Sequence, residues 1–326
     1  NVSTVTSANA MPFDRVGFSD FALDAFWTIL RKIMHDDLSG IHQPIEFSLP
    51  DQRQKDLFAI SDEQVAFFDD NGYLADISIL DESFVAALCD DLERLMQPEF
   101  AEDPRFYEYH QNEATSGNGI LFHALGAWRL SIAFHDLVFH PAMSMPASQL
   151  LRGPVRLWHD QVFVKPKFDG GVVAWHQDYS YWTRTKPMAH LTCWIGLDDS
   201  NEENGCVHYI PGSHKWDLLP RTDLANDMDA VLSVLSDEQR ESFKPVPMIS
   251  KAGHASFHHP LMLHGSFANR SPRPRRAAVI NFIRDGVVSD SDLPLLDGVP
   301  PVPVGDKIEG RFFPLLSELP AGSNVR

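Results

Sequence analysis

The 326-residue sequence has little cysteine, no long apolar run and no sign of a leader at its start. Its three cysteines, Cys89, Cys193 and Cys206, form no CxxC pair, which argues against a zinc ribbon or a disulfide framework and favours reduced thiols in a cytoplasmic protein. No apolar run reaches the length of about 18 residues expected of a membrane-spanning helix. The first residues, NVSTVTSANAM, lack the basic and apolar regions of a secretory signal, so we expect none there.

Basic residues are also scarce, since 27 lysines and arginines stand against 45 aspartates and glutamates and give a formal net charge of −18. A protein that binds duplex nucleic acid normally presents a basic face, and no spacing of lysines and arginines indicates one here. The serine-hydrolase elbow, the HExxH zinc motif and Walker-type phosphate loops are missing as well. We therefore expect a small-molecule substrate, with neither nucleic acid nor a membrane as partner, while the oligomeric state stays open.

The first half of the sequence is dominated by helical patterns. Apolar residues at helical spacing predict an amphipathic helix over 19–34, a second helix from Ser61 to Gly72 and a third over 82–96. Ser61 and Gln64 form the pattern of a capping box at the start of the second helix. We expect residues 1–57 to be an N-terminal extension and residues 58–318 to form a single domain.

From about residue 154 the pattern changes to short β-branched and aromatic runs separated by turn residues. The candidate strands are 156–164, 172–176, 190–197, 206–210, 254–259, 261–266 and 277–284. Strands of this number and spacing predict a sandwich, jelly roll or barrel, with its core over about 154–285. A helical insertion is expected at about 223–243, and the proline-rich segment 293–305 is expected to be extended and on the surface.

One group of residues in this second half has the composition of a metal site. His176-Gln177-Asp178 is followed by His264, 88 residues after His176. Two imidazoles and one carboxylate are the ligands of mononuclear iron(II) oxygenases and leave half of the metal's coordination sphere open. His176 lies in a predicted strand, where residues i and i+2 share a face. The other His-x-Asp triplet, His35-Asp36-Asp37, falls in a helical pattern, where they do not.

Arg275 follows His264 by 11 residues and suits the cosubstrate of such a site. A guanidinium presents a planar fork that binds a carboxylate through two parallel hydrogen bonds. Two open metal positions can take the keto oxygen and adjacent carboxylate of 2-oxoglutarate, the third can take dioxygen, and Arg275 can hold the far carboxylate. The alternative interpretation is a solvated basic patch formed by Arg273, Arg275 and Arg276.

Three segments, VVAWHQDYSYW, ENGCVHYIPGSHK and HGSFANRSPRPRR, together resemble the phytanoyl-CoA dioxygenase family of iron(II)- and 2-oxoglutarate-dependent oxygenases. The similarity covers roughly residues 60–290, and SDEQVAFFDDNGYL resembles the family's usual opening helix. The resemblance implies a double-stranded β-helix core, also called a jelly roll or cupin-like barrel, with flanking helices. It implies iron ligands at His176, Asp178 and His264, a contact from Arg275 to the distal carboxylate, and cosubstrate-pocket residues Gln161, Trp194 and Ser266.

Further candidates lie close to the ligands in sequence. Tyr179, Tyr181 and Trp182 are tentative substrate contacts, with ordinary barrel packing as the alternative. His258 and His259 are adjacent in a predicted strand and must point to opposite faces, so one of them can reach the pocket. We predict His259 to be the tentative substrate contact and expect His264 to be the only iron ligand in that histidine-rich segment.

The leading hypothesis is an iron(II)- and 2-oxoglutarate-dependent dioxygenase that hydroxylates, or otherwise oxidises, an unactivated C–H bond of a small organic molecule and releases succinate and CO2. Related halogenases have Ala or Gly in place of the acidic ligand, so Asp178 disfavours halogenation. Desaturation, epoxidation and cyclisation use the same residues and stay open. A non-catalytic, metal-binding cupin-like sensor and a zinc hydrolase are the alternatives, and both leave Arg275 without a role.

Overall fold

The computed structural model describes residues 36–46, 58–111, 121–168, 171–221 and 227–317. The helix expected over 19–34 and His35 of the second His-x-Asp triplet lie outside these residues. Residues Asp37–Arg326 form one compact unit, which contains all the elements described below. No described helix combines the length and the apolarity needed to cross a membrane.

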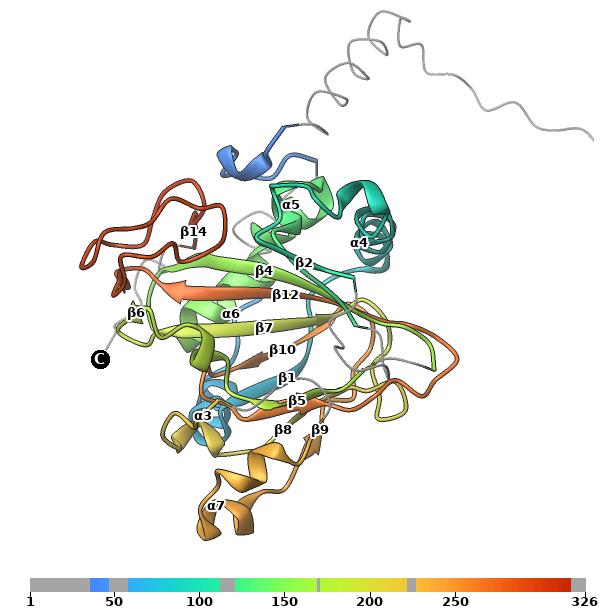
Figure 1. Ribbon diagram of the computed structural model, residues 1–326, viewed down its shortest axis with the longest axis vertical. Coiled ribbons are helices and arrows are strands. Elements are labelled where there is room, and N and C mark those ends of the chain that lie inside the picture. The colour runs from blue at the N-terminus through green and yellow to red at the C-terminus, as the bar shows by residue number, and fades with distance from the viewer. Residues whose placement is uncertain (1–35, 47–57, 112–120, 169–170, 222–226, 318–326) are drawn as a thin grey trace, which may run out of the picture. The chain divides into compact units, whose positions relative to one another are not determined.

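Two antiparallel sheets form the centre of this unit (Figure 1). The major sheet has the order β1 (Tyr73–Ser78), β10 (His254–His258), β7 (His190–Gly196), β12 (Arg275–Arg284), β4 (Val155–Lys165), β3 (Phe122–Leu125) and β2 (Glu108–His110), with β14 (Leu315–Ser317) also paired to β4. The minor sheet has the order β5 (Val173–His176), β11 (His264–Ser266), β8 (Val207–Tyr209) and β9 (Val246–Pro247). A third pair joins β6 (Thr185–Lys186) to β13 (Val288–Ser289). Neighbours that are far apart in sequence give the double-stranded β-helix, or jelly-roll, arrangement that the sequence predicted.

Alternation along the central strands separates a helix-covered face from a cavity face. On β12, Ala278, Ile280 and Phe282 are buried in the large apolar core. Arg275 and Val279 of the same strand line a cavity instead. Successive side chains of a strand point to opposite faces, so one strand supplies both the core and the site.

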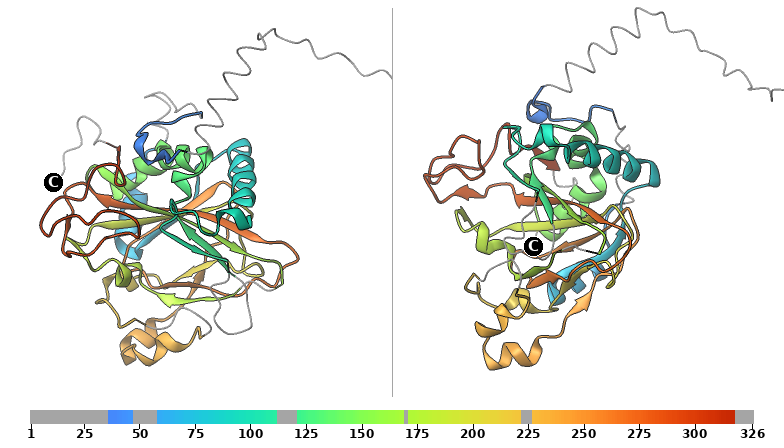
Figure 2. Two further views of the ribbon diagram at one scale, coloured as in Figure 1. Left: turned by 45° about the horizontal axis from the view of Figure 1, so that its top comes forward. Right: turned by 45° about the vertical axis from the view of Figure 1, so that its right-hand side comes forward.

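Helices cover the outer face of the major sheet (Figures 1 and 2). They are α4 (Glu82–Leu95), α5 (Ile132–Val138) and α6 (Pro141–Leu150), and their apolar side chains share one core with the sheet. The helix α3 (Asp62–Asn71) begins after Ser61 with the predicted capping box and ends at Gly72, whose φ of 80° is the left-handed conformation that glycine adopts without strain. The predicted helices at 61–72 and 82–96 are thus confirmed.

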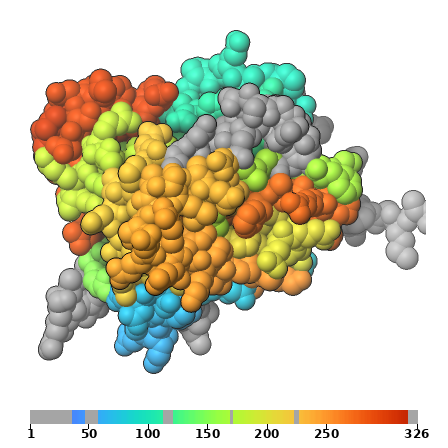
Figure 3. All heavy atoms as spheres, turned by 60° about the horizontal axis from the view of Figure 1, so that its bottom comes forward, coloured from blue at the N-terminus to red at the C-terminus, as the bar shows by residue number. Residues whose placement is uncertain are grey.

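The expected helical insertion consists, in its described part, of the 3-10 turn η6 (Ala230–Ser233) and α7 (Asp237–Ser242). α7 begins with a capping box between Ser236 and Gln239. Val231 and Leu235 share an apolar cluster with Trp175 and Leu263 of the minor-sheet region. Figure 3 shows the insertion, in gold and orange, on the face of the molecule that is turned towards the viewer.

Each of the seven predicted strand runs contains a strand, but two other expectations need correction. β1, β2 and β3 lie in the half where we expected helices. The segment 293–305 forms no strand, yet it is not simply a surface segment. The segment contributes Leu295, Leu296 and Val299 to a buried cluster with Trp158 and Trp182. This packing removes the apolar surface of both aromatic rings from water.

Candidate active site

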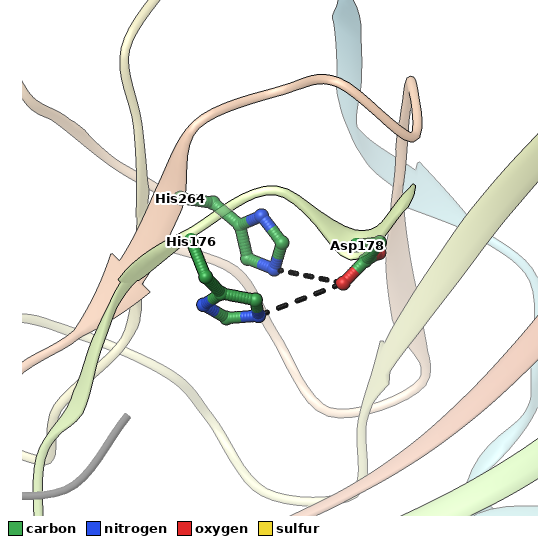
Figure 4. Close-up of side chains that lie close together, drawn as sticks. All are labelled: His176, Asp178 and His264. Atoms are coloured by element: carbon green, nitrogen blue, oxygen red, sulfur yellow. Dashed lines mark ion pairs between the residues drawn. The ribbon is translucent and has the colours of Figure 1, made fainter. Parts of the chain in front are cut away.

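The two histidines and the aspartate of the predicted metal site come together at one end of the minor sheet (Figure 4). His176 ends β5, His264 begins β11, and the two residues are direct partners across the antiparallel pair. Asp178 Oδ1 lies 3.5 Å from His176 Nε2 and 3.6 Å from His264 Nε2. One donor atom from each of the three residues lies within 4.8 Å of the other two, which is the spacing of ligands around a single ion.

The local geometry of Asp178 differs from our expectation of a continuous strand. β5 ends at His176, and Asp178 begins the 3-10 turn η4 (Asp178–Tyr181). The turn, rather than the pleat of a strand, therefore brings the carboxylate beside the His176 ring. The backbone bond from Tyr179 N to Pro260 O, 3.0 Å long, ties this turn to the segment that leads into β11.

Both histidines turn Nε2 to the centre and have Nδ1 held by a backbone carbonyl oxygen. Nδ1 of His176 lies 2.8 Å from Ala174 O, and Nδ1 of His264 lies 2.9 Å from Met262 O. A carbonyl oxygen only accepts, so each Nδ1 carries a proton and donates it. In the neutral form of either ring, the lone pair of Nε2 then faces the carboxylate. Three converging electron-pair donors are stable together only around a cation, so the donor set fits a divalent metal.

The charge states favour the same interpretation. Burial, together with the nearby His176, holds the pKa of His264 well below its usual value, so its ring is neutral at pH 7. Burial would raise the pKa of Asp178, but the surrounding histidines, with His258 as a hydrogen-bond donor to Oδ2, hold this pKa well below its usual range. A carboxylate and neutral imidazoles are the forms in which these side chains bind a metal.

A cavity leads from the three donors to Arg275. It has about 570 Å³ of empty space, part of which is open to solvent. Gln161, Trp194 and Ser266, the three other residues expected to form the cosubstrate pocket, all line it. The structure thus brings all seven residues predicted for the metal and the cosubstrate to one cavity.

Arg275 is buried without an anionic partner. Its side chain lies over the Trp194 ring, 5.4 Å from the ring centroid, and the residue is 2% exposed. Its Nε has no acceptor, and no hydrogen bond from its guanidinium to a described residue is present. Burial lowers the pKa of Arg275 to about 10, against the opposing influence of Cys206 and Asp198, so the group stays charged at neutral pH. A buried cation without an anionic partner among the described residues is costly, and an anion bound at this end of the cavity would offset that cost.

Two residues of this region were missed in the sequence. Lys165 is the cross-strand partner of Arg275, and its Nζ donates to the carbonyl oxygens of Ser266 (3.2 Å) and Phe267 (2.6 Å). His123 Nε2 lies 3.1 Å from Oε1 of Gln161, a residue that lines the cavity. Alternation from Gln161 to Lys165 along β4 could have identified Lys165, whereas His123 comes from a strand that we did not predict.

The tentative substrate residues are placed differently from one another. Tyr179 donates its hydroxyl to Thr185 O at 2.8 Å. Trp182 is 7% exposed, stacks against His190 and belongs to the apolar cluster that contains Trp158, rather than to the lining of the cavity. Tyr181 lies beside the His176 ring at a centroid distance of 6.2 Å and beneath the guanidinium of Arg221 at 4.2 Å.

His259 does not line the cavity, and His258 does. The ring of His259 packs against that of His214, with 5.4 Å between centroids. His258 Nε2 lies 3.0 Å from the second carboxylate oxygen of Asp178. The reason is the alternation noted above, which allows only one of two adjacent strand residues to face inward. The residue that reaches the pocket is therefore His258, and our choice of His259 is corrected.

Comparison with known proteins agrees with this geometry. The family model described as "Phytanoyl-CoA dioxygenase (PhyH)" matches residues 68–277, which is more than half of the sequence. The chain belongs to the phytanoyl-CoA dioxygenase family. It is accordingly a non-haem dioxygenase that uses iron(II), 2-oxoglutarate and dioxygen.

Curated relatives are similar over much of this dioxygenase. The ectoine dioxygenase of Bordetella parapertussis is 28% identical over 234 residues, which cover 67% of this chain and 73% of the relative. The phytanoyl-CoA dioxygenase of Arabidopsis thaliana is 32% identical over 154 residues, which cover 46% and 52%. The L-proline trans-4-hydroxylase of Streptomyces griseoviridis is 31% identical over 165 residues, which cover 45% and 62%.

Solved structures share the fold. The non-haem, α-ketoglutarate-dependent carbocyclase SnoK from nogalamycin biosynthesis superimposes with a TM-score of 0.64 at 25% identity, over 79% of this chain and 97% of SnoK. EctD from S. alaskensis superimposes with a TM-score of 0.58 at 22% identity, over 77% and 83%. Both comparisons support the jelly-roll architecture described above.

Proposed function

We propose that His176, Asp178 and His264 hold one iron(II) ion and that Arg275 binds the far carboxylate of 2-oxoglutarate. The observation that carries this proposal is the buried guanidinium of Arg275, whose Nε has no acceptor among the described residues and which lies in the same cavity as the three converging donors. The metal would stand between the two Nε2 atoms and Asp178 Oδ1. An anion at Arg275 would remove the cost of an unpaired buried charge.

The residues around the cavity have distinct proposed roles. Ala174 O and Met262 O hold the two imidazole rings through their Nδ1–H groups, so the rings are oriented before a metal binds. Trp194 forms a wall beside Arg275, and Gln161 and Ser266 offer polar contacts to the cosubstrate. When bound, iron(II) supplies the dioxygen chemistry that converts 2-oxoglutarate to succinate and CO2 and oxidises a substrate C–H bond.

We propose hydroxylation of a small organic molecule as the reaction. An acidic residue at position 178 disfavours halogenation, and the relatives named for ectoine and L-proline act on small molecules. Tyr181 and Arg221 line a second cavity that shares His176 with the first, which supports a substrate contact there. Tyr179 and Trp182 are proposed to shape the wall rather than to touch substrate.

The alternative, a metal-binding protein without turnover, is disfavoured because it gives Arg275 nothing to bind. We further propose that residues 58–318 make up one oxygenase domain after an extension over 1–57. All three cysteines are free and buried, which supports a reducing, cytoplasmic setting.

The test is turnover of 2-oxoglutarate. The protein is loaded anaerobically with iron(II) and 2-oxoglutarate, mixed with oxygenated buffer and a panel of small molecules that includes L-proline and ectoine, and succinate is measured. Asp178→Ala is the matched control, because it removes one ligand and leaves Arg275 in place. Succinate at the level of that control across the whole panel would contradict the proposal.

A further inference from the structure

Asp178 uses its two carboxylate oxygens differently. Oδ1 faces the Nε2 atoms of His176 and His264. Oδ2 lies 2.6 Å from Thr192 Oγ1 and 3.0 Å from His258 Nε2. Thr192 and His258 are both buried, at 4% and 2% exposure, so water does not compete for these two contacts.

The contact between His258 and Oδ2 is the end of a chain of hydrogen bonds. An ionised carboxylate only accepts, so His258 Nε2 carries the proton that it shares with Asp178. Nδ1 of the same ring lies 2.9 Å from the Tyr209 hydroxyl. That hydroxyl in turn lies 2.9 Å from Ser256 Oγ. These contacts hold the His258 ring in the orientation that turns Nε2 towards Asp178.

The contact between Thr192 and Oδ2 is also supported by neighbouring side chains. Thr192 Oγ1 lies 2.6 Å from Asp178 Oδ2 and 2.9 Å from Asn281 Oδ1, yet it has only one proton to donate. The shorter contact is to the charged carboxylate and takes this proton. The amide of Asn281 must therefore turn its NH2 group towards Thr192. The carbonyl oxygen of Asn281 then takes the position that lies 3.3 Å from His159 Nδ1. In this orientation Nδ1 is the nitrogen of the His159 ring that carries the proton.

These contacts come from rigid parts of the fold. His258 and Ser256 lie on β10, Tyr209 on β8, and Thr192 and Asn281 on the paired strands β7 and β12. Asp178 itself lies in a turn between strands. The sheets therefore determine the rotation of a carboxylate that the turn alone would leave free to swing about its terminal bond.

We propose that His258 and Thr192 are positioning residues that occupy Oδ2 of Asp178 from two sides and so limit it to one oxygen as a metal ligand. This inference rests on the proposed iron site. A carboxylate held in this way takes one coordination position and leaves three for cosubstrate and dioxygen. Without the two donors Oδ2 becomes free to reach the same ion, and one position needed by 2-oxoglutarate is lost. The same bond keeps His258 Nε2, which carries a proton, from acting as a ligand.

Two pairs of variants separate this role from simple packing. His258→Leu and Thr192→Val remove the donors, whereas His258→Gln and Thr192→Ser keep an N–H or an O–H at about the same place. Thr185→Val is the matched control. Thr185 is a buried threonine whose hydroxyl donates to Trp182 O, and it does not take part in the hydrogen bonds that lead to Asp178 through His258 or Thr192. Each protein is titrated anaerobically with Co(II), whose visible absorption reports the coordination of the ion, and the Fe(II) form is titrated with 2-oxoglutarate.

We expect His258→Leu and Thr192→Val to change the Co(II) spectrum and to weaken 2-oxoglutarate binding by about tenfold or more. His258→Gln, Thr192→Ser and Thr185→Val should resemble the parent protein. Folded Leu and Val variants with parental spectra and parental 2-oxoglutarate affinity would overturn the inference, as would a Gln variant that behaves like the Leu variant. If the Leu variant does not fold, the threonine pair and His258→Gln decide the outcome.

Failure of the iron proposal would look different. The parent protein itself would then bind no Co(II), or would bind it without any response to 2-oxoglutarate. That result would overturn the inference together with the proposal on which it rests, whereas a parental response in the Leu and Val variants would overturn the inference alone.

Discussion

His176 and His264 face each other directly across the antiparallel pair of β5 and β11, with 4.1 Å between their ring centroids. The residues are 88 positions apart in sequence, so only the pairing of these two short strands brings them together. A slip of one residue in that pairing would turn one of the two rings to the opposite face. The register of β5 and β11 is therefore a condition for the metal site.

The first prediction concerns two histidines of the same segment. His264→Ala removes one of three proposed ligands and should lower metal affinity by about a hundredfold or more, beyond the effect usual for residues that only support a ligand. His259→Ala should leave metal affinity unchanged, because its ring packs against His214 and does not line the cavity. Titration with Co(II) or Fe(II) under nitrogen measures both, and equal losses in the two variants would contradict the assignment.

The second prediction concerns Gly265, between His264 and Ser266 on β11. A Cβ at this position would lie 3.0 Å from Val173 O and 3.2 Å from Trp175 N, both in the backbone of β5. Gly265→Ala must therefore push β5 and β11 apart, which should cost about 1–3 kcal/mol of stability and weaken metal binding about tenfold. Gly40→Ala is the control, since a Cβ there meets nothing within 4 Å. Urea unfolding and metal titration should show both effects in the first variant and neither in the second.

Much of the site could be predicted because its residues are of types that few other chemistries need in that combination. Two histidines, an aspartate and a following arginine indicated a metal and a dicarboxylate before any strand was paired. Period-two alternation also predicted the strands themselves. The same rule required His258 and His259 to face apart, but it did not say which of them faced inward.

The remaining features depend on contacts between distant segments. The 3-10 turn at Asp178 is tied to Pro260, 82 residues from it, and no local pattern predicts that contact. The burial of Leu295 and Leu296 follows from the presence of Trp158, which lies far away in sequence on β4. The hydrogen bonds to Asp178 Oδ2 come from β7 and β10, so their convergence could be known only from the sheet order.

The third prediction concerns Arg275 and its neighbour Arg276. Arg275→Ala removes a charged, two-pronged hydrogen-bond donor and should weaken 2-oxoglutarate binding by about a hundredfold, equal to about 3 kcal/mol. Iron affinity should change little, because Arg275 makes no contact with the three proposed ligands. Arg276 points to the other face of β12 and pairs with Asp198 at 2.8 Å, so Arg276→Ala is the matched control and should keep the parental 2-oxoglutarate affinity. A parallel loss of iron and 2-oxoglutarate binding in Arg275→Ala would refute the role given to this residue.

The fourth prediction is a loss of stability in acid that originates outside the site. His140 caps α6, where its Nδ1 accepts from Ala142 N at 3.2 Å, and burial lowers its pKa to about 4 although Asp81 opposes the shift. Between pH 4 and the usual histidine pKa of about 6.5 the unfolded chain binds more protons at this residue than the folded one, so the free energy of unfolding falls as the pH falls. The contribution of His140 to this loss should be about 2 kcal/mol between pH 7.5 and pH 5. His140→Asn keeps an acceptor suited to the helix start and does not titrate. Urea unfolding at the two pH values should therefore show a smaller acid loss in the variant by about that amount, and an identical loss in both proteins would show that His140 is not responsible.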